Sequence, residues 1–465
     1  MPHALRRGAA LALAALLSSS AVRAQPAVPL DQRYRADANR LIQAALADSF
    51  AYDRLATMVD RFGNRLSGSE SLERTIDWVI DEMRRDGLQN VRGEPVMVPH
   101  WVRGEESAEL VSPRALPLHM IGLGMSAGTP PGGITADVLV VTSFDDLTAH
   151  AAEARGKIVL FDVPFTGYRE TVGYRGAGAS AAAKVGAVGA LIRSVSSASM
   201  QNPHTGSLRY DTTVARIPAA ALSVEDAMML HRMQARGERV RVHLAMGARQ
   251  LPDVQSRNVV AEIVGRERPD EVVVLGGHID SWDVGTGAMD DGGGVVAAWQ
   301  AVRLMQRLGL RPRRTVRVVA WTNEENGTRG GRGYLAAHQG EVGRHQLAME
   351  SDNGVFKPFG FRFQGSDSAL VLMRQIARLL EPIGAGRMEK GDGEADVGPM
   401  IALGVPGLAL DVDGTKYFWY HHSSADTMDK LDPREMATCV AAMAVMAYVV
   451  ADMPETLTHE VPAQR

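Results

Sequence analysis

Apolar residues recur with helical spacing through residues 33–87 of the chain. The clearest case is SGSESLERTIDWVIDEMRRDGL, in which Ser69 is a candidate N-cap and Gly87 is a stop signal. The apolar positions that share one face of this helix are Leu72, Ile76, Val79 and Met83. The pattern predicts amphipathic helices whose apolar faces pack against a sheet.

From about Gly133 the pattern changes to short apolar strands and helices of small residues, in ADVLVV, GKIVLFDV, AGASAAAKVGAVGALI, IPAAALSVEDAMMLHRM and VRVHLAMG. Ser223, followed three residues later by Asp226, resembles a capping box at the start of a helix. The glycine and alanine content suits close packing of a helix on a sheet. Because no run of catalytic residue types occurs here, we predict a separate accessory domain over residues 118–250.

From Ser256 onward, near-continuous apolar strands alternate with helices, the strands being NVVAEIVG, EVVVLGGHID, TVRVVAWTNEE, HQLAMESD and VPGLALDV. The helix GGVVAAWQAVRLMQRLG has the inward positions Val295, Trp299, Val302 and Met305. Such strands predict an α/β fold with a mixed, largely parallel sheet covered by helices on both faces. The domain division is then an N-terminal helical part at 25–117, the accessory domain at 118–250 and the main domain at 251–465.

The first 24 residues differ from the rest of the chain. Arg6 and Arg7 precede the apolar run GAALALAALL, which ends in small residues before Gln25. This pattern predicts a secretory signal peptide at 1–24 and an exported protein, periplasmic or secreted. A membrane anchor is the alternative, but the run is shorter than the roughly 20 apolar residues that a span needs. The arginine pair raises the twin-arginine route, although the surrounding residues favour the ordinary one.

Composition narrows the choice of partners. Fifty basic and 54 acidic residues give a net charge of -4, and no basic run indicates nucleic acid binding. We expect no membrane span in the mature chain and a small molecule or another protein as partner, with a homodimer left open. Cys439 is the only cysteine, so intramolecular disulfides are excluded, and its apolar neighbours predict a buried, inert thiol.

Metal-ligand residue types follow four predicted strands. They are His278 and Asp280, Glu324 and Glu325, Asp352, and His421 and His422. Ligands of open α/β sheets collect beyond the carboxyl ends of the strands. Each position alone has an ordinary explanation, such as a hydrogen-bonded histidine, a solvated acidic pair or a turn. Their joint occurrence at four strand ends favours a shared site.

A hydrolytic site with two metals needs carboxylates and imidazoles around two ions, with one carboxylate bridging them. Two histidines, one bridging aspartate, one glutamate and one further aspartate meet that need. Zinc suits mixed histidine and carboxylate ligands, and a water between two such ions becomes a nucleophile without any serine or cysteine. The sequence therefore predicts two zinc ions per chain.

The motifs GGHIDSWDVGTGAMDDGGG, TNEENGTRGG, MESD and YHHSSADT resemble those of the co-catalytic zinc aminopeptidase and carboxypeptidase family. That family includes bacterial leucyl aminopeptidases and the plasma glutamate carboxypeptidase (carboxypeptidase Q) branch, and the motifs and their spacing are most similar to that branch. The resemblance extends over nearly the whole mature chain. It implies a zinc-peptidase fold, with 251–465 as the catalytic domain and a protease-associated domain, from about 133 to 247, as an insert that acts as a lid or selects substrates.

The resemblance also implies roles for individual residues. Metal ligands are His278, Asp290 as the bridge, Glu325, Asp352 and His422. The catalytic residues are Glu324 as general base and Asp280, which orients His278. The family's last histidine stands four residues before the aspartate of a closing Asp-Thr pair, so Asp426 selects His422 and leaves His421 as a structural or substrate-facing neighbour. Asp291 is either a helix N-cap or the second residue of a cis peptide after the bridging aspartate.

The implied reaction is hydrolysis of an amide bond in short peptides or dipeptides, although the wider family favours removal of an N-terminal residue. Glu324 takes a proton from water and returns it to the leaving amine. Candidate substrate contacts are Asp396, Tyr417, Tyr420 and His421. Asp396 is equally well explained as a helix cap, and the two tyrosines as core residues.

Two other functions compete with this interpretation. Glutaminyl cyclases are acyltransferases that resemble the family but use a single zinc, and a zinc content near one per chain would favour them. Receptor-like scaffolds keep the fold without catalysis but have lost metal ligands. Because all five ligand positions are filled here, both alternatives are disfavoured.

Overall fold

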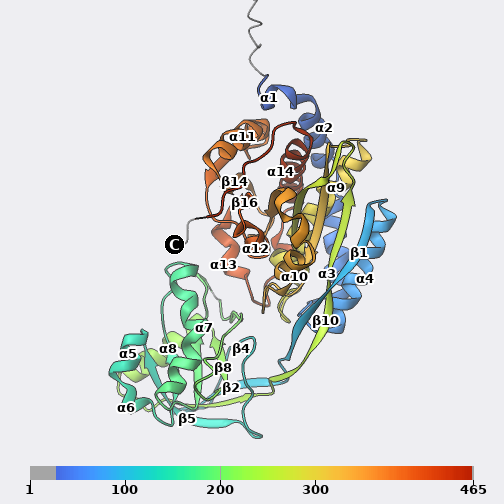
Figure 1. Cartoon of the computed structure of the whole chain (residues 1–465). Helices are drawn as coiled ribbons and strands as arrows, with labels where there is room; N and C mark the ends of the chain where they lie inside the picture. Colours follow the sequence, from blue (N-terminus) through green and yellow to red (C-terminus); the bar gives the residue numbers. More distant parts are fainter. Residues whose placement is uncertain (1–27, 199, 463–465) are drawn as a thin grey trace, which may run out of the picture.

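The computed structural model describes residues 28–198 and 200–462, and these form two units, each built around a mixed sheet. In Figure 1 the larger unit lies above the smaller one, and two long strands run between them. The predicted signal peptide at 1–24 lies outside the described residues.

The sheet of the larger unit has the order β1-β10-β12-β11-β13-β16-β14-β15. Its strands are β1 (Gln89–Val102), β10 (Arg249–Ile263), β11 (Arg268–His278), β12 (Arg314–Trp321), β13 (His345–Glu350), β14 (Pro358–Gln364), β15 (Arg387–Lys390) and β16 (Gly407–Val412). The four central strands β12, β11, β13 and β16 are parallel, and antiparallel pairs join them to β10 on one side and β14 on the other. The predicted mixed, largely parallel sheet is confirmed. The parallel arrangement places four carboxyl ends along one edge.

Helices cover both faces of this sheet. The apolar core on one face includes residues of α2 (Arg35–Leu46), α3 (Phe50–Phe62), α4 (Glu70–Arg85), α9 (Gly293–Arg307), α11 (Asp367–Ala377) and α14 (Pro433–Asp452). Residues of α10 (Arg329–Ala337) and α12 (Gly398–Ile401) belong to the core of the other face. Short helices complete the unit: α1 (Leu30–Arg33) and α13 (Tyr417–Tyr420). Alternate strand side chains therefore enter two separate apolar layers.

The apolar pattern of the N-terminal helices is confirmed. The Ser69 hydroxyl accepts the N–H of Leu72 at the start of α4, and Gly87 follows that helix with a left-handed φ of 78°. The inward-facing side chains of α4 are fully buried: Leu72, Ile76, Val79 and Met83. The same is true of the α9 positions Val295, Trp299, Val302 and Met305.

One described helix, α14, is long and apolar enough to cross a membrane, with a mean hydropathy of 1.5. Most of it, 89%, is buried among the other core elements. Cys439 lies within this helix and is buried, as predicted, and burial raises the pKa of its thiol. The helix is therefore the centre of the larger core.

The smaller unit contains a second sheet in the order β3-β2-β9-β5-β6-β7-β8-β4. Its elements are β2 (Glu106–Ser112), β3 (Leu116–Leu118), β4 (Met120–Gly122), β5 (Ile134–Val141), α5 (Phe144–Ala149), α6 (Ala151–Ala154), β6 (Ile158–Phe161), α7 (Tyr168–Lys184), β7 (Gly189–Arg193), β8 (Ala219–Leu222), α8 (Val224–Ala235) and β9 (Arg241–Met246). Because β2 pairs with β9, the sheet begins upstream of residue 118, where the sequence had placed the start of the accessory domain. Ser223 caps α8 by accepting the N–H of Asp226, but the Asp226 carboxylate bonds to His119, so the capping box is only half formed.

The two units are joined by a ribbon of β1 and β10, which pair along most of their length and end at the pair Val102 and Arg249. Strand β1 was not predicted from the sequence. Its sequence QNVRGEPVMVPHWV contains a glycine and two prolines, and many of its side chains are exposed or half-buried because it is an edge strand. The chain thus enters and leaves the smaller unit on neighbouring strands.

Candidate metal centre

The carboxyl ends of the four parallel strands bring together the predicted ligand residues. His278 ends β11, Glu324 and Glu325 follow β12, Asp352 follows β13, and His421 and His422 follow α13, which comes after β16. Asp290 lies in the turn Ala288–Gly292 that leads into α9, and its backbone, with φ -122° and ψ 91°, is not helical. Residues separated by as many as 144 positions in sequence meet here because parallel strands share one edge.

One group of ligand atoms surrounds the end of β11. Nε2 of His278 lies 3.2 Å from Oδ1 of Asp290 and 3.1 Å from Oδ1 of Asp352. These separations suit three atoms that ligate one ion at about 2 Å each. The three residues are therefore a candidate ligand set for a first metal ion.

A second group faces the other oxygen of Asp290. Nε2 of His422 lies 3.4 Å from Oδ2 of Asp290 and 2.9 Å from Oε2 of Glu325. Nε2 of His421 lies 3.6 Å from the same Asp290 oxygen, and the rings of His421 and His422 are stacked with centroids 3.5 Å apart. Both histidines therefore lie beside this position, while the contact with Glu325 belongs to His422.

Asp290 stands between the two groups with one oxygen toward each. Its Oδ2 is buried and has no hydrogen-bond partner among the described residues, which is unusual for a carboxylate unless a cation satisfies it. The Asp290–Asp291 peptide is cis, as the resemblance implied. The Asp291 carboxylate accepts the N–H of His278 and the N–H of Gly294, so it also caps the start of α9. A β-carbon at Gly294 would lie 2.0 Å from the Ser351 carbonyl oxygen, so this close approach requires glycine.

The centre carries an excess of buried carboxylates. Burial raises the pKa of Asp291 and of Glu325 well above their ordinary values, and the neighbouring Asp290 carboxylate raises that of Glu325 further. Burial alone would lower the pKa of the His278 imidazole, but Asp352 and Asp290 raise it well above its ordinary value. Both effects express a strongly negative site that attracts cations.

At the second position the pKa of the histidine is lowered, whereas that of His278 is raised. Burial and the adjacent His421 ring lower the pKa of His422 well below its ordinary value, so the ring is neutral at physiological pH. Burial lowers the pKa of His421 to about 3 as well. Neutral imidazole is the form that binds metals.

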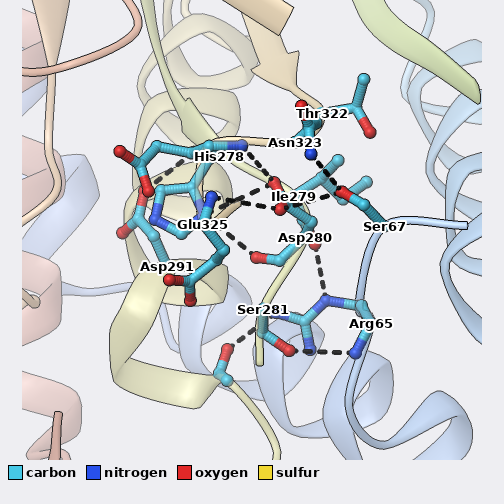
Figure 2. Close-up of polar contacts among 12 residues, drawn as sticks. Arg65, Ser67, His278, Ile279, Asp280, Ser281, Asp291, Thr322, Asn323 and Glu325 are labelled. Atoms are coloured by element: carbon cyan, nitrogen blue, oxygen red, sulfur yellow. Dashed lines mark hydrogen bonds and ion pairs between the residues drawn. The ribbon is translucent and has the colours of Figure 1, made fainter. Parts of the chain in front are cut away.

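Asp280 supports two strand ends at once (Figure 2). Its carboxylate accepts the backbone N–H of Glu324 at 3.0 Å and of Glu325 at 3.4 Å. The His278 ring contacts the Asp280 main-chain oxygen at 3.0 Å, while the nearest carboxylate oxygen is 3.8 Å from Nδ1. In this structure the His278 ring is therefore oriented by the Asp280 backbone, and the Asp280 side chain positions the loop after β12.

Glu324 is half-buried and lines a cavity of about 560 Å³ between the two units. Desolvation and the carboxylates of Asp352 and Asp396 raise the pKa of Glu324 well above its ordinary value. Residues of both units line the rest of the cavity, including Met125 and Tyr210 from the smaller one and Arg329 from α10. The volume is that of a small-ligand site.

Other residues predicted as substrate contacts have different surroundings. Asp396 is fully buried, and its carboxylate accepts the N–H of Gly331 while its own N–H donates to Glu350. The Tyr417 hydroxyl donates to the Asp352 carbonyl oxygen at 3.3 Å, which places this tyrosine beside the ligands. The Tyr420 ring contacts Lys430 and Trp419, and among the described residues no hydrogen bond or ring contact joins its side chain to the ligands.

Several supporting residues were missed in the sequence. Arg65 is fully buried and donates to the carbonyl oxygens of Ile279, Thr286 and Gly287 on both ends of the loop after His278 (Figure 2). Asp426 accepts the N–H of Asp290 and of Met289. From the sequence it had served only to choose His422 over His421 as the expected ligand. The single arginine has no pattern around it that points to the site. The Asp-Thr pair after the histidines was the only available signal.

The chain is similar to known proteins in both sequence and fold. The sequence profile of peptidase family M28 matches residues 258–447. Over 88% of its length the chain is 50% identical to carboxypeptidase Q of Mus musculus and 49% identical to that of Homo sapiens, covering 87% of each. A solved structure of a peptidase M28 precursor from Shewanella amazonensis matches with a TM-score of 0.90 at 37% identity, over 93% of this chain and 100% of that one. A zinc aminopeptidase from Bacillus subtilis shares the fold, with a TM-score of 0.67 at 18% identity over 87% of this chain and 94% of that one.

Proposed function

Because this chain belongs to peptidase family M28, we propose that it is a zinc-dependent exopeptidase that hydrolyses short peptides or dipeptides. The observation that carries the proposal is the position of Asp290. Its two oxygens face two different histidines, His278 and His422, at 3.2 Å and 3.4 Å. A carboxylate placed in this way suits a bridge between two metal ions.

The residues present fit two zinc ions. His278, Asp290 and Asp352 would hold one, and Asp290, Glu325 and His422 the other. The donor set of imidazole and carboxylate suits zinc, and a bound ion would give Oδ2 of Asp290 the partner that it lacks among the described residues. Zinc, when bound, supplies Lewis acidity that polarises a scissile carbonyl and lowers the pKa of water.

Glu324 performs the proton transfers in this mechanism. Its carboxylate accepts a proton from the attacking water as the carbon–oxygen bond forms, and returns the proton to the leaving nitrogen as the carbon–nitrogen bond breaks. A raised pKa suits a carboxyl that must both accept and donate near neutral pH. Asp280 keeps the Glu324 backbone in place. We assign His421 and Tyr417 to substrate contact, because they border the ligands, and keep Asp396 and Tyr420 as weaker candidates.

Replacement of the general base tests the mechanism. Glu324→Gln removes the proton acceptor without changing the shape of the side chain, and we expect kcat to fall about 10²- to 10⁴-fold. Zinc content and thermal unfolding should match the wild type. Hydrolysis at near wild-type rates would exclude Glu324 as the base. Glu389→Gln, at an exposed position of β15, is the matched control.

A substrate panel tests the exopeptidase assignment. Free dipeptides, N-blocked dipeptides and longer peptides are hydrolysed with and without a zinc chelator, and metal content is measured by elemental analysis. We expect about two zinc ions per chain, loss of activity with the chelator and preference for short peptides with free ends. Equal cleavage of blocked and free peptides would contradict removal of a terminal residue. A content near one zinc would favour a cyclase-like reaction.

We also propose that the protein is exported, with residues 1–24 as its signal peptide, and that the smaller unit is a protease-associated domain. N-terminal sequencing of the protein from the native host tests the first proposal. The expected N-terminus is near Gln25, and an intact Met1 in the mature protein would contradict it.

A further inference from the structure

Three hydrogen bonds join the smaller unit to the segment that carries His421 and His422. Nδ1 of His204 lies 2.6 Å from the His421 carbonyl oxygen, and the N–H of Thr205 donates to the His422 carbonyl oxygen at 2.8 Å. The Ser196 hydroxyl donates to the Phe418 carbonyl oxygen at 2.6 Å. All three donors belong to the loop between β7 and β8, and all three acceptors belong to the other unit.

These contacts fix the backbone of His422. Its φ is 58°, in the left-handed region that a residue with a β-carbon seldom adopts. Rotation about φ turns the peptide before His422, and rotation about ψ turns the peptide after it. The carbonyl of the first peptide is held by His204 and that of the second by Thr205. The smaller unit therefore restrains both torsions of this one residue.

The surroundings of the His204 ring suit its hydrogen bond to the His421 carbonyl oxygen. It is 1% exposed, and burial lowers its pKa to about 4, so the ring is neutral at physiological pH. A carbonyl oxygen can only accept, so the one ring proton lies on Nδ1. Its Nε2 is buried without a partner among the described residues, which agrees with a bare nitrogen at that position.

Arg175 of α7 contacts both the same loop and the His422 ring. Its guanidinium donates to the Thr205 carbonyl oxygen at 3.3 Å and to the Tyr168 hydroxyl at 2.7 Å, and Nη1 lies 3.3 Å from Nδ1 of His422. A β-carbon at Gly206 would lie 2.4 Å from the guanidinium, so glycine leaves the space that Arg175 occupies. The Tyr168 ring in turn stacks on Phe418, with centroids 5.0 Å apart.

We propose that the smaller unit acts as a positioning device for a metal ligand, in which His204 and Thr205 hold the left-handed backbone that directs the His422 ring toward Asp290 and Glu325. His204 is the positioning residue, since it acts on the ligand through the His421 carbonyl. The role of His422 as a zinc ligand rests on the proposed function. The restraint on its backbone does not.

Hydrogen exchange of the metal-free protein tests the restraint directly. His204→Leu has a similar volume but no donor, and it leaves the His421 carbonyl without its partner. We expect the amides of Thr205, His421 and Ser423 to exchange about tenfold faster than in the wild type. His204→Asn, whose side-chain amide can replace Nδ1 as donor, should restore slow exchange.

Zinc affinity gives the second readout. Chelator competition should show one of two zinc ions bound about 10- to 100-fold more weakly in His204→Leu, as expected when a residue that orients a ligand is removed. His231→Leu, in the same unit but paired with Asp162 and without a hydrogen bond or ion pair to the segment among the described residues, is the control and should leave both readouts unchanged.

The outcomes separate the two proposals. Wild-type exchange and zinc affinity in His204→Leu, or equal changes in His231→Leu, would overturn the positioning role. If the wild type binds fewer than two zinc ions, the two-metal proposal fails, and hydrogen exchange still decides the positioning role. If His204→Leu does not fold, His204→Ala removes the same donor without placing a branched side chain in the loop, and unchanged exchange of the His421 and Ser423 amides would overturn the proposal.

Discussion

The Asp280 carboxylate accepts the backbone N–H of Glu324 at 3.0 Å, which ties the end of β11 to the loop after β12. The same carboxylate accepts the N–H of Glu325, and the Ser67 hydroxyl donates to it at 3.3 Å. The side chain is fully buried. It therefore fixes the proposed base and a proposed ligand by their main chains.

Asp280→Asn tests this support. An amide offers one acceptor oxygen in place of two and places an N–H donor beside a backbone N–H. We expect kcat to fall about 10- to 100-fold, with a smaller change in zinc content, because the Glu324 loop shifts while the ligand atoms of His278 and Asp352 remain. Steady-state kinetics and elemental analysis check this. Unchanged kcat would show that the Asp280 side chain does not position Glu324.

Contact with Glu325 distinguishes the expected role of His422 from that of His421. Of these two described histidines, only His422 has an ion-pair contact with Glu325, at 2.9 Å. We expect His422→Leu to lose about one zinc ion per chain and His421→Leu to retain both, measured by elemental analysis after dialysis. The two substitutions are matched in size and burial, so each is the control for the other. Equal zinc loss in both variants would make His421 a ligand.

Arg65→Met tests the loop that follows His278. The substitution keeps much of the aliphatic volume but leaves several buried carbonyl oxygens without donors. We expect the free energy of unfolding to fall by about 3 kcal/mol and zinc to dissociate faster. Denaturant titration checks the first expectation and chelator kinetics the second. Arg61→Met, at an exposed position of α3, should change neither.

His345 predicts how stability depends on pH. Burial lowers the pKa of this imidazole to about 4 from its ordinary 6.5. Between these values the unfolded chain binds a proton that the folded protein does not, so stability falls as pH decreases from about 6.5 to about 4. The loss from this residue is on the order of 3 kcal/mol.

His345→Gln isolates this contribution because its side chain does not titrate. Denaturant titrations of metal-free wild type and variant are compared at pH 7 and pH 4, so that protonation of the zinc ligands cancels in the difference. The wild type should lose more stability than the variant. Parallel losses in the two proteins would show that His345 is not titrated on unfolding.

The central strands and the predicted ligands were accessible from sequence because both signals are local. Each strand is a short apolar run, and His278, Glu325 and Asp352 lie within a few residues of a strand end, so the edge rule for parallel sheets could bring them together. Asp290 and His422 lie farther from a strand end, and their assignment came from the family resemblance. The helical faces around Leu72 and Val295 follow from periodicity alone.

Supporting residues whose partners are distant in the sequence could not be predicted. Arg65 and His204 lie in loops without periodic pattern, and their partners are 214 and 217 positions away. Neither distance nor direction is encoded near them. Asp280 was identified as a supporting residue, but its actual partners depend on how β12 packs beside β11.

The antiparallel ribbon of β1 and β10 gives the molecule a modular chain topology. Val102 and Arg249 face each other where the chain departs and returns, so a tight hairpin turn at that point would close the larger unit without the intervening segment. A protein shortened in this way would keep its sheet and its main core. It would lack the loop that holds the carbonyls of His421 and His422. The smaller unit can therefore be removed without breaking the strand order of the larger one, but its removal would take away the hydrogen bonds to the His421 and His422 carbonyls.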